Sequence, residues 1–201
     1  MAISTWAQPL SPVLDVEGKP LRSGVEYYIL PAETDIAGGL TSICNGSFPL
    51  YVGQEPLAPN VSQGTPVIFR PRFADTIIRE SRDFTVAFSG ATTCADSSAW
   101  EVVDHPETRK RYIATGGKFR QPRPRVWYFN IVKNEQGLYT LAWCQNCTIH
   151  FPGADCHPSS RCVSAGILKE NGKRLLVLDD PAFPFVFRRA KVILPASTKN
   201  N

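Results

Sequence analysis

Short runs of β-branched and aromatic residues, separated by turn-forming segments, recur along almost the whole chain. FTVAF at residues 84–88 and RYIAT at residues 111–115 are typical of them. Most of the 17 prolines and 14 glycines lie between the runs, where these residues favour turns. We find no long amphipathic helix pattern. Runs spaced about 8–12 residues apart predict an all-β fold, a barrel or a sandwich.

The sequence shows no linker and no shift in composition that would divide it. We therefore expect one domain over residues 1–201, with residues 1–12 and 196–201 as flexible termini. The composition, 43% hydrophobic and 20% charged, suits a globular protein with a substantial core. A hairpin ending in a glycine turn recurs weakly, which gives a faint threefold rhythm. It lies near residues 27–40, 112–117 and 138–143.

Charge and hydropathy restrict the partners. The formal net charge of +4 is too small to require a nucleic-acid partner. No segment approaches the roughly 20 apolar residues of a membrane helix. The N-terminus also lacks the basic and apolar regions that mark a signal peptide. We therefore expect neither a nucleic-acid nor a membrane partner.

Six cysteines are the strongest chemical signal in the chain. They are Cys44, Cys94, Cys144, Cys147, Cys156 and Cys162. The last four are interspersed with His150 and His157, and thiolates and imidazoles are zinc ligands. Cys144 and Cys147 have the spacing of a zinc site, but Cys156 and Cys162 do not repeat it. Disulfides are therefore the favoured interpretation and zinc is the alternative.

Three Asn-x-Ser/Thr sequons are candidate glycosylation sites. They begin at Asn45, Asn60 and Asn146. Such sites favour, weakly, a protein that passes through the secretory route.

Two further features of the sequence bear on binding and catalysis. The basic segment at residues 107–125 could bind a polyanion, although a solvated strand face is the favoured interpretation. None of the three histidines lies in a recognisable nucleophile or metal-hydrolase motif. We therefore predict no enzyme, no cofactor and no metal.

The segment RPRFAD at residues 70–75 differs from the strand-like residues on either side of it. It combines two arginines, a proline and an aromatic residue. Such a segment is either a solvated turn between strands or a surface that meets a partner.

The segment VLDVEGKPLRSGVEYYILP at residues 13–31 resembles the signature of the plant Kunitz, or soybean-trypsin-inhibitor-like, protease inhibitors. The matching positions are Val13, Asp15, Glu17, Gly18, Lys19, Leu21, Tyr27 and Ile29. The resemblance continues in the family's order through GTPVIF at residues 64–69, TIIRESRDFTVAF at 76–88 and KRLLVL at 173–178. It spans nearly the whole chain and is specific for the family rather than for one target.

This resemblance implies a β-trefoil with pseudo-threefold symmetry, in a plant protein that is secreted or vacuolar. It also implies structural disulfides in place of a metal site. The implied pairs are Cys44–Cys94, Cys144–Cys162 and, as in six-cysteine, miraculin-like members, Cys147–Cys156 nested inside the second.

Inhibitors of this family insert the loop between their fourth and fifth strands into a serine protease as a substrate-like segment. A rigid scaffold holds that loop in the bound conformation, so little entropy is lost on binding. The corresponding residues here are Arg70, Pro71, Arg72, Phe73, Ala74, Asp75 and Thr76. The family braces the loop with an Asn, and the residue at that position here is Ser23.

The sequence leaves three alternatives for the residue that enters the main pocket of the protease. A gap-free alignment places Ala74 there, which suits elastase- or subtilisin-like enzymes. A shift by one residue places Phe73 there, which suits chymotrypsin-like enzymes. A shift by two places Arg72 there, which suits trypsin-like enzymes with an acidic pocket floor.

We therefore predict a monomeric inhibitor of serine proteases whose partner is the target protease. One alternative is inhibition of cysteine or aspartic proteases or of α-amylase through another loop, for which residues 144–162 are a candidate. Another is a non-inhibitory, miraculin-like storage or binding role.

Overall fold

The computed structural model describes residues 10–33, 36–43, 50–90, 97–116, 126–144 and 162–191. Within these ranges the regular structure is all β, in 12 strands. The strands are β1 Glu26–Pro31, β2 Leu40–Ile43, β3 Leu50–Gln54, β4 Val67–Pro71, β5 Phe84–Phe88, β6 Glu101–Asp104, β7 Arg111–Thr115, β8 Phe129–Lys133, β9 Tyr139–Cys144, β10 Cys162–Glu170, β11 Lys173–Leu178 and β12 Pro184–Arg189. Across the described ranges, no helix has the length and hydropathy needed to span a bilayer.

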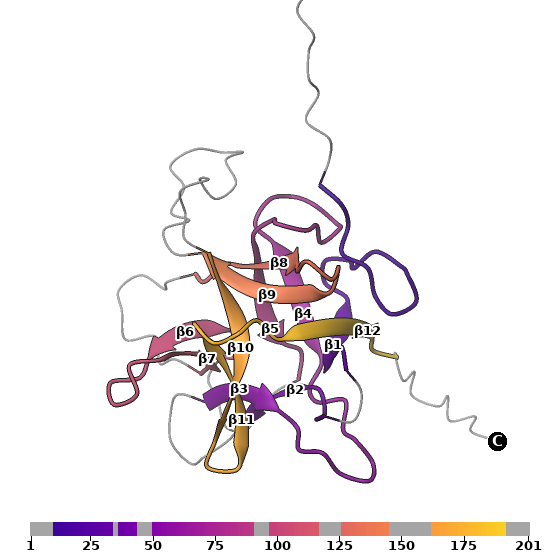
Figure 1. Ribbon diagram of the computed structural model, residues 1–201. Helices are drawn as coiled ribbons and strands as arrows, with labels where there is room; N and C mark the ends of the chain where they lie inside the picture. The colour runs from indigo at the N-terminus through magenta and orange to yellow at the C-terminus, as the bar shows by residue number, and fades with distance from the viewer. Residues whose placement is uncertain are drawn as a thin grey trace, which may run out of the picture.

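Six of the strands close a barrel (Figure 1). β1 pairs with β4, β4 with β5, β5 with β8, β8 with β9 and β9 with β12, and β12 returns to β1. Every pairing in the ring is antiparallel. A closed ring has no free sheet edge at which another chain could add a strand.

The other six strands form three hairpins, β2–β3, β6–β7 and β10–β11. Strand β3 pairs with β7 and β11, and β11 also pairs with β7, so the three hairpins meet one another. Each group of four consecutive strands thus gives its first and fourth strands to the barrel and its middle two to a hairpin. This is a β-trefoil, which confirms the predicted fold and accounts for the threefold rhythm of the sequence.

The barrel is filled by aromatic and aliphatic side chains that alternate along the strands. In β5, Phe84, Val86 and Phe88 are buried and the residues between them are half-buried, as the two-residue period of a strand requires. The ring of Phe69 on β4 meets those of Phe84 and Phe187 edge-on, with centroids 5.2 and 5.8 Å apart. Burial of each such side chain contributes about 1.5–3 kcal/mol, so the ends of β4 and β5 are firmly held.

Two details differ from the expectations drawn from sequence. The strand-like runs of the sequence do not include β2, β3 or β10, and in β3 it is Gly53 that interrupts the apolar pattern. A Cβ at Gly53 would lie 2.4 Å from Ile43 Cδ1 and 2.5 Å from the Arg174 carbonyl oxygen, so the strands on either side can approach only because this residue is glycine.

Residues 10–12, expected to belong to a flexible terminus, are instead ordered by pairing. The carbonyl of Ser11 accepts a hydrogen bond from the N–H of Glu80 at 2.9 Å. Pro12 forms a β-bridge with Arg79. These backbone groups find partners in the segment that follows β4, and the other predicted flexible residues, 1–9 and 196–201, lie outside the described ranges.

Candidate functional site

The segment between β4 and β5 is a loop whose two ends are joined. The N–H of Arg72 donates to the carbonyl of Asp83, 2.9 Å away, one step beyond the last paired residues, Pro71 and Phe84. Residues 73–82 therefore project from a closed hairpin end. This loop contains Phe73, the tip residue Ala74 and the residues that follow them in the predicted protease-facing segment.

Arg70 and Pro71 lie before the loop, at the end of β4. Arg70 is exposed and lies opposite Thr85 of β5, while Pro71 is half-buried and lies opposite Phe84. Both residues thus belong to the sheet that supports the loop.

Arg72 turns back onto the barrel. Its Nη1 lies 3.3 Å from Asp83 Oδ2, and only 16% of its side chain is exposed. Its guanidinium also lies over the ring of Tyr128, 4.5 Å from the centroid, and 5.8 Å from that of Phe73. Cation–π contacts of this kind contribute about 0.5–2 kcal/mol. The charge of Arg72 is therefore committed to the scaffold.

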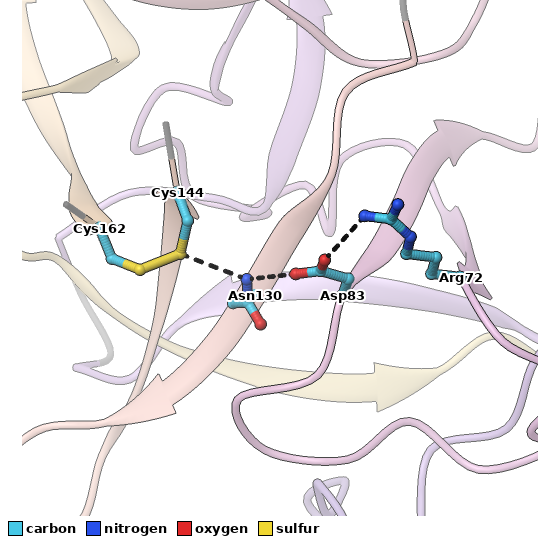
Figure 2. The surroundings of a disulfide bond; sticks show 5 residues. All are labelled: Arg72, Asp83, Asn130, Cys144 and Cys162. Carbon is cyan, nitrogen blue, oxygen red and sulfur yellow. Dashed lines mark hydrogen bonds and ion pairs between the residues drawn. A yellow bond between two sulfur atoms is a disulfide. The ribbon is translucent and has the colours of Figure 1, made fainter. Parts of the chain in front are cut away.

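Asp83 links Arg72 to the centre of the barrel wall (Figure 2). Its carboxylate is buried, and its Oδ1 accepts a 2.9 Å hydrogen bond from Asn130 Nδ2 on β8. The same amide nitrogen lies 3.5 Å from Cys144 Sγ, in the disulfide to Cys162. A buried carboxylate without partners costs several kcal/mol, so these contacts are what permit Asp83 to lie there.

Phe73, Ala74 and Asp75 form the tip of the loop. The N–H of Asp75 donates to the Phe73 carbonyl at 2.6 Å, which closes a γ-turn centred on Ala74. Ala74 does not have a positive φ, so the turn is of the common inverse type. Phe73 is half-buried, whereas Ala74 is exposed. Ala74 is therefore the exposed residue at the centre of the turn.

The Asp75 side chain turns away from the tip and into the loop. Its Oδ1 accepts a hydrogen bond from the N–H of Ile77, and its Oδ2 accepts one from Arg79 Nε, each at 3.0 Å. These contacts lower the pKa of the Asp75 carboxyl, with the Ile77 N–H as the largest cause and the Arg79 guanidinium as a further one. Arg79 Nη1 also donates to the Leu10 carbonyl at 3.0 Å.

The second arm of the loop pairs with the N-terminal segment. The N–H of Ser23 donates to the carbonyl of Thr76 at 2.9 Å, so Ser23 contacts the loop through its backbone. Ile78 exchanges hydrogen bonds with the same segment, donating to Leu21 and accepting from Val13, each at 2.9 Å. The exposed residue Thr76 is thereby fixed by its main chain.

A tight turn at residues 79–82 completes the loop. Ser81 adopts a left-handed conformation with φ 58°, which an L-residue adopts at some cost. Its N–H donates to the Ile131 carbonyl on β8 at 2.9 Å, and this contact holds the turn against the barrel.

Residues of the loop and of the strand ends beside it line a half-open cavity of about 220 Å³. Its apolar lining includes Phe73, Ile77 and Phe84, and its polar lining includes Asp75 and Arg79. The loop is therefore supported at its ends and along its second arm rather than by dense packing beneath its tip.

Comparison with known proteins gives the family. The family model described as Kunitz legume, trypsin and protease inhibitor, matches residues 13–189. The chain belongs to the plant Kunitz inhibitor family. It is 33% identical over 184 residues to Kunitz type trypsin inhibitor 104 of Medicago truncatula, covering 88% of this chain and 87% of that protein.

Solved structures of Kunitz inhibitors share the fold of this chain. A Kunitz type trypsin inhibitor from Cicer arietinum superposes with a TM-score of 0.72 at 28% identity, covering 90% of this chain and 100% of that one. The bifunctional α-amylase/subtilisin inhibitor of rice, Oryza sativa, superposes with a TM-score of 0.69 at 28% identity, with the same coverage.

The Kunitz chain carries one disulfide within the described ranges. It joins Cys144 and Cys162, which lie directly opposite each other on β9 and β10 with Cα atoms 3.9 Å apart. This is one of the pairs that the resemblance implies. The other two implied pairs, Cys44–Cys94 and Cys147–Cys156, lie outside the described residues.

The sequons fall in different parts of the Kunitz chain. Asn60 is exposed in the connection between β3 and β4, where a glycan would have room. Asn45 and Asn146 lie outside the described ranges.

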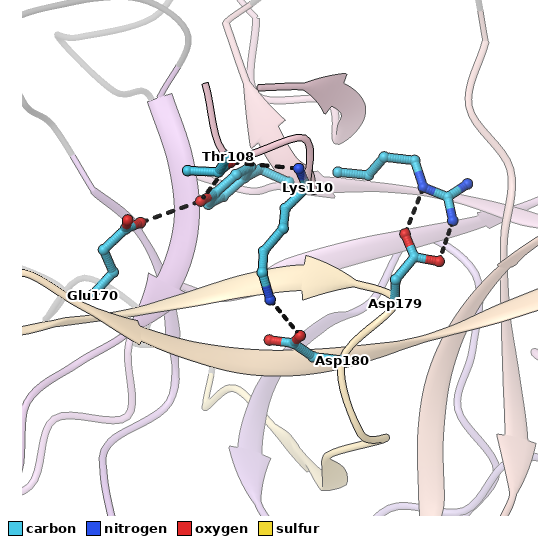
Figure 3. A network of polar contacts seen from close by, with 7 residues as sticks. Thr108, Lys110, Glu170, Asp179 and Asp180 are labelled. Atoms are coloured by element: carbon cyan, nitrogen blue, oxygen red, sulfur yellow. Dashed lines mark hydrogen bonds and ion pairs between the residues drawn. The ribbon is translucent and has the colours of Figure 1, made fainter. Parts of the chain in front are cut away.

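A network of polar contacts joins residues 110–111, at the start of β7, to residues 179–180, which follow β11 (Figure 3). The guanidinium of Arg111 forms two hydrogen bonds with the Asp179 carboxylate. Lys110 Nζ lies 2.6 Å from Asp180 Oδ1. Two cations of the predicted basic segment are thus paired within the molecule, and residues 117–125 of that segment lie outside the described ranges.

The described part of the chain brings together no three His, Cys, Asp or Glu side chains in an arrangement that could hold a metal ion. His105, which is described, accepts a hydrogen bond at Nδ1 from the N–H of Thr108 at 3.3 Å and lies against the Tyr112 ring. Its role within these contacts is to close the turn between β6 and β7.

Sequence reasoning missed several residues that shape the loop. They are Asp83, Asn130, Tyr128 and Arg79. In the folded chain Asp83 meets Arg72 and Asn130, Tyr128 meets Arg72, and Arg79 separately meets Asp75. The one local signal is Asp75 four residues before Arg79, a spacing usually considered for helices rather than loops.

Proposed function

We propose that this Kunitz-family chain inhibits serine proteases whose main pocket accepts a small side chain, such as elastase- or subtilisin-like enzymes, and that Ala74 is the residue in that pocket. The observation that carries the proposal is the contrast at the tip. Ala74 is exposed, whereas Arg72 forms an ion pair with the buried Asp83. Inhibition of this kind requires no catalytic group from the inhibitor.

Arg72 is poorly suited to enter a trypsin-like pocket. It would have to leave Asp83, whose side chain is 2% exposed, and remove the cation that compensates this buried carboxylate. Breaking a buried ion pair from one side costs about 3–5 kcal/mol. The stacking on Tyr128 would be lost as well. Contacts in the protease pocket would have to offset both losses.

Phe73 is the next candidate and is also partly engaged. It is half-buried, lines the cavity inside the loop and contacts the Arg72 guanidinium. Moving its ring into a chymotrypsin-like pocket would exchange one apolar environment for another, with little net gain in apolar burial.

Ala74 needs no rearrangement of its side chain. Asp75, the residue after it, has its carboxylate satisfied by Ile77 and Arg79, so its charge is directed away from the position where the protease would lie. The similarity to a rice inhibitor whose name includes subtilisin agrees with a target of the small-pocket class.

The Cys144–Cys162 disulfide supports an oxidising compartment for the chain. We therefore propose a secreted or vacuolar location, where extracellular or stored proteases are the available targets.

A panel of trypsin, chymotrypsin, elastase and subtilisin tests the proposed function. Each enzyme is titrated with the inhibitor, and residual activity is followed on a chromogenic peptide. We expect stoichiometric inhibition of elastase or subtilisin and much weaker inhibition of trypsin. Failure to inhibit any of the four at micromolar concentration would remove the proposal, and selective inhibition of trypsin would reject Ala74 as the pocket residue.

A further inference from the structure

We propose that Arg79 is a positioning residue of the inhibitory loop: through Asp75 and the Leu10 carbonyl it clamps the residue that follows the Ala74–Asp75 bond to the N-terminal segment. The inference rests on the proposed function, because it assigns the support of the same loop.

The clamp is a continuous set of contacts. Arg79 Nε donates to Asp75 Oδ2 and Arg79 Nη1 donates to the Leu10 carbonyl, each at 3.0 Å. The other oxygen of Asp75 accepts from the Ile77 N–H, also at 3.0 Å. The guanidinium therefore joins the loop tip to a strand-like segment of the scaffold with two donors in a fixed planar arrangement.

This loop needs such a support. The family's bracing position is occupied here by Ser23, whose contact with the loop is its N–H to the Thr76 carbonyl. The cavity inside the loop gives little packing beneath the tip. At the tip, the Asp75 side chain is held at both carboxylate oxygens, one by the Ile77 N–H and the other by Arg79.

The clamp acts on the side of the bond where a protease would release an amine. Hydrolysis of the Ala74–Asp75 bond consumes one water and gives a carboxylate on Ala74 and an amine on Asp75. The Arg72–Asp83 ion pair holds the first end, and the Arg79 clamp holds the second. Both ends then stay within reach of each other, which favours resynthesis of the bond over release.

An exposed ion pair by itself changes an equilibrium by at most about fivefold. Here the Asp75 and Arg79 side chains are 37% and 27% exposed, and the same carboxylate accepts a backbone N–H. Charge-assisted hydrogen bonds are worth more than neutral ones. We therefore expect that loss of the clamp weakens inhibition by about tenfold.

The test compares Arg79→Ala with Arg79→Lys and with the matched control Lys169→Ala, which removes an exposed cation from β10. The melting temperature, the inhibition constant and the rate at which cut inhibitor accumulates are measured for each. Arg79→Ala should keep its melting temperature within a few degrees, inhibit about tenfold less tightly and accumulate the form heavier by one water. Arg79→Lys should recover part of the loss, and Lys169→Ala should match the parent chain.

Equal inhibition constants and equal cleavage rates for Arg79→Ala and the parent chain would overturn the clamp. If Arg79→Ala does not fold, Asp75→Asn takes its place, because it keeps an oxygen for the Ile77 N–H and removes the charge that Arg79 binds. If the parent chain inhibits no protease, the proposed function is rejected but the clamp is still testable, because hydrogen exchange of the free protein measures it without a protease. There the Ile77 amide should exchange faster in Arg79→Ala, and unchanged exchange would count against the clamp.

Discussion

Asp83 and Asn130 are joined by a buried hydrogen bond of 2.9 Å between Oδ1 and Nδ2. The bond connects the end of the loop between β4 and β5 to β8, and both residues are at least 96% buried. Because Arg72 binds the other oxygen of Asp83, this pair couples the conformation of the loop to the barrel wall. Stability and inhibition should therefore respond together to changes at this point.

Replacement of Asp83 by Ala should lower the free energy of unfolding by about 2–4 kcal/mol, because Asn130 and the mostly buried Arg72 guanidinium each lose a partner. Chemical denaturation followed by circular dichroism measures the change. Asp104→Ala, at an exposed position on β6, is the control and should change stability by about 0.5 kcal/mol or less. A similar small effect for Asp83→Ala would show that the network contributes little.

Ala74→Arg should convert the inhibitor to a trypsin-directed one. The new side chain would leave the loop supports at Arg72 and Arg79 intact and would meet the acidic floor of a trypsin-like pocket. A charged side chain fits a small apolar pocket badly, so inhibition of elastase or subtilisin should fall by about two orders of magnitude. Inhibition constants against the same panel measure both changes, and an unaltered profile would show that another residue enters the pocket.

Removal of the Cys144–Cys162 bridge by the double change to Ala should lower the free energy of unfolding by about 3 kcal/mol, given the sequence separation of 18. The bridge also lies beside Asn130, so the loop should become easier to cleave. Thermal denaturation and limited proteolysis report the two effects separately. Loss of stability with no change in cleavage would place the bridge outside the support of the loop.

The Asp75 contacts should survive in mild acid. The pKa of Asp75 lies below its ordinary value of 3.8, chiefly because its carboxylate accepts the Ile77 N–H and is paired with Arg79. A lowered carboxyl pKa adds stability above the unfolded value, and that stability is lost as the pH falls through the folded value. The Ile77 amide resonance should therefore stay constant from about pH 7 to pH 4 and shift only below the ordinary value. In Asp75→Asn the acid shift should be absent, and a midpoint above 3.8 in the parent chain would contradict the lowered pKa.

Much of the architecture can be predicted from the chain because its strands carry a two-residue alternation. The strands at FTVAF and RYIAT coincide with β5 Phe84–Phe88 and β7 Arg111–Thr115. Strand β10 is harder to predict. Its first residue is Cys162, and the cysteines before it favour a disulfide or metal-site interpretation over a strand. Strand β3 is also hard to predict, because a glycine usually weakens a strand. Gly53 is accommodated because the neighbouring strands approach it closely, and the sequence of β3 does not show that approach.

The loop can be located from sequence, but the roles of its residues cannot be assigned. Arg72, Phe73 and Ala74 are adjacent, and only the folded chain shows that the first of them is directed toward Asp83 and Tyr128. Two of these partners, Asp83 and Tyr128, follow Arg72 by 11 positions or more. Non-local contacts of this kind leave no periodic pattern from which their geometry could be read.

Through the hydrogen bonds from Arg79 to Leu10 and from Glu80 to Ser11, two residues near the amino terminus support a loop that lies more than 60 positions later in the chain. Removal of the chain through Ser11 by another enzyme would leave the barrel strands and the tip in place, yet it would remove the backbone groups that Arg79 and Glu80 bind. Proteolysis near the amino terminus would then weaken inhibition even though the loop itself stays uncut.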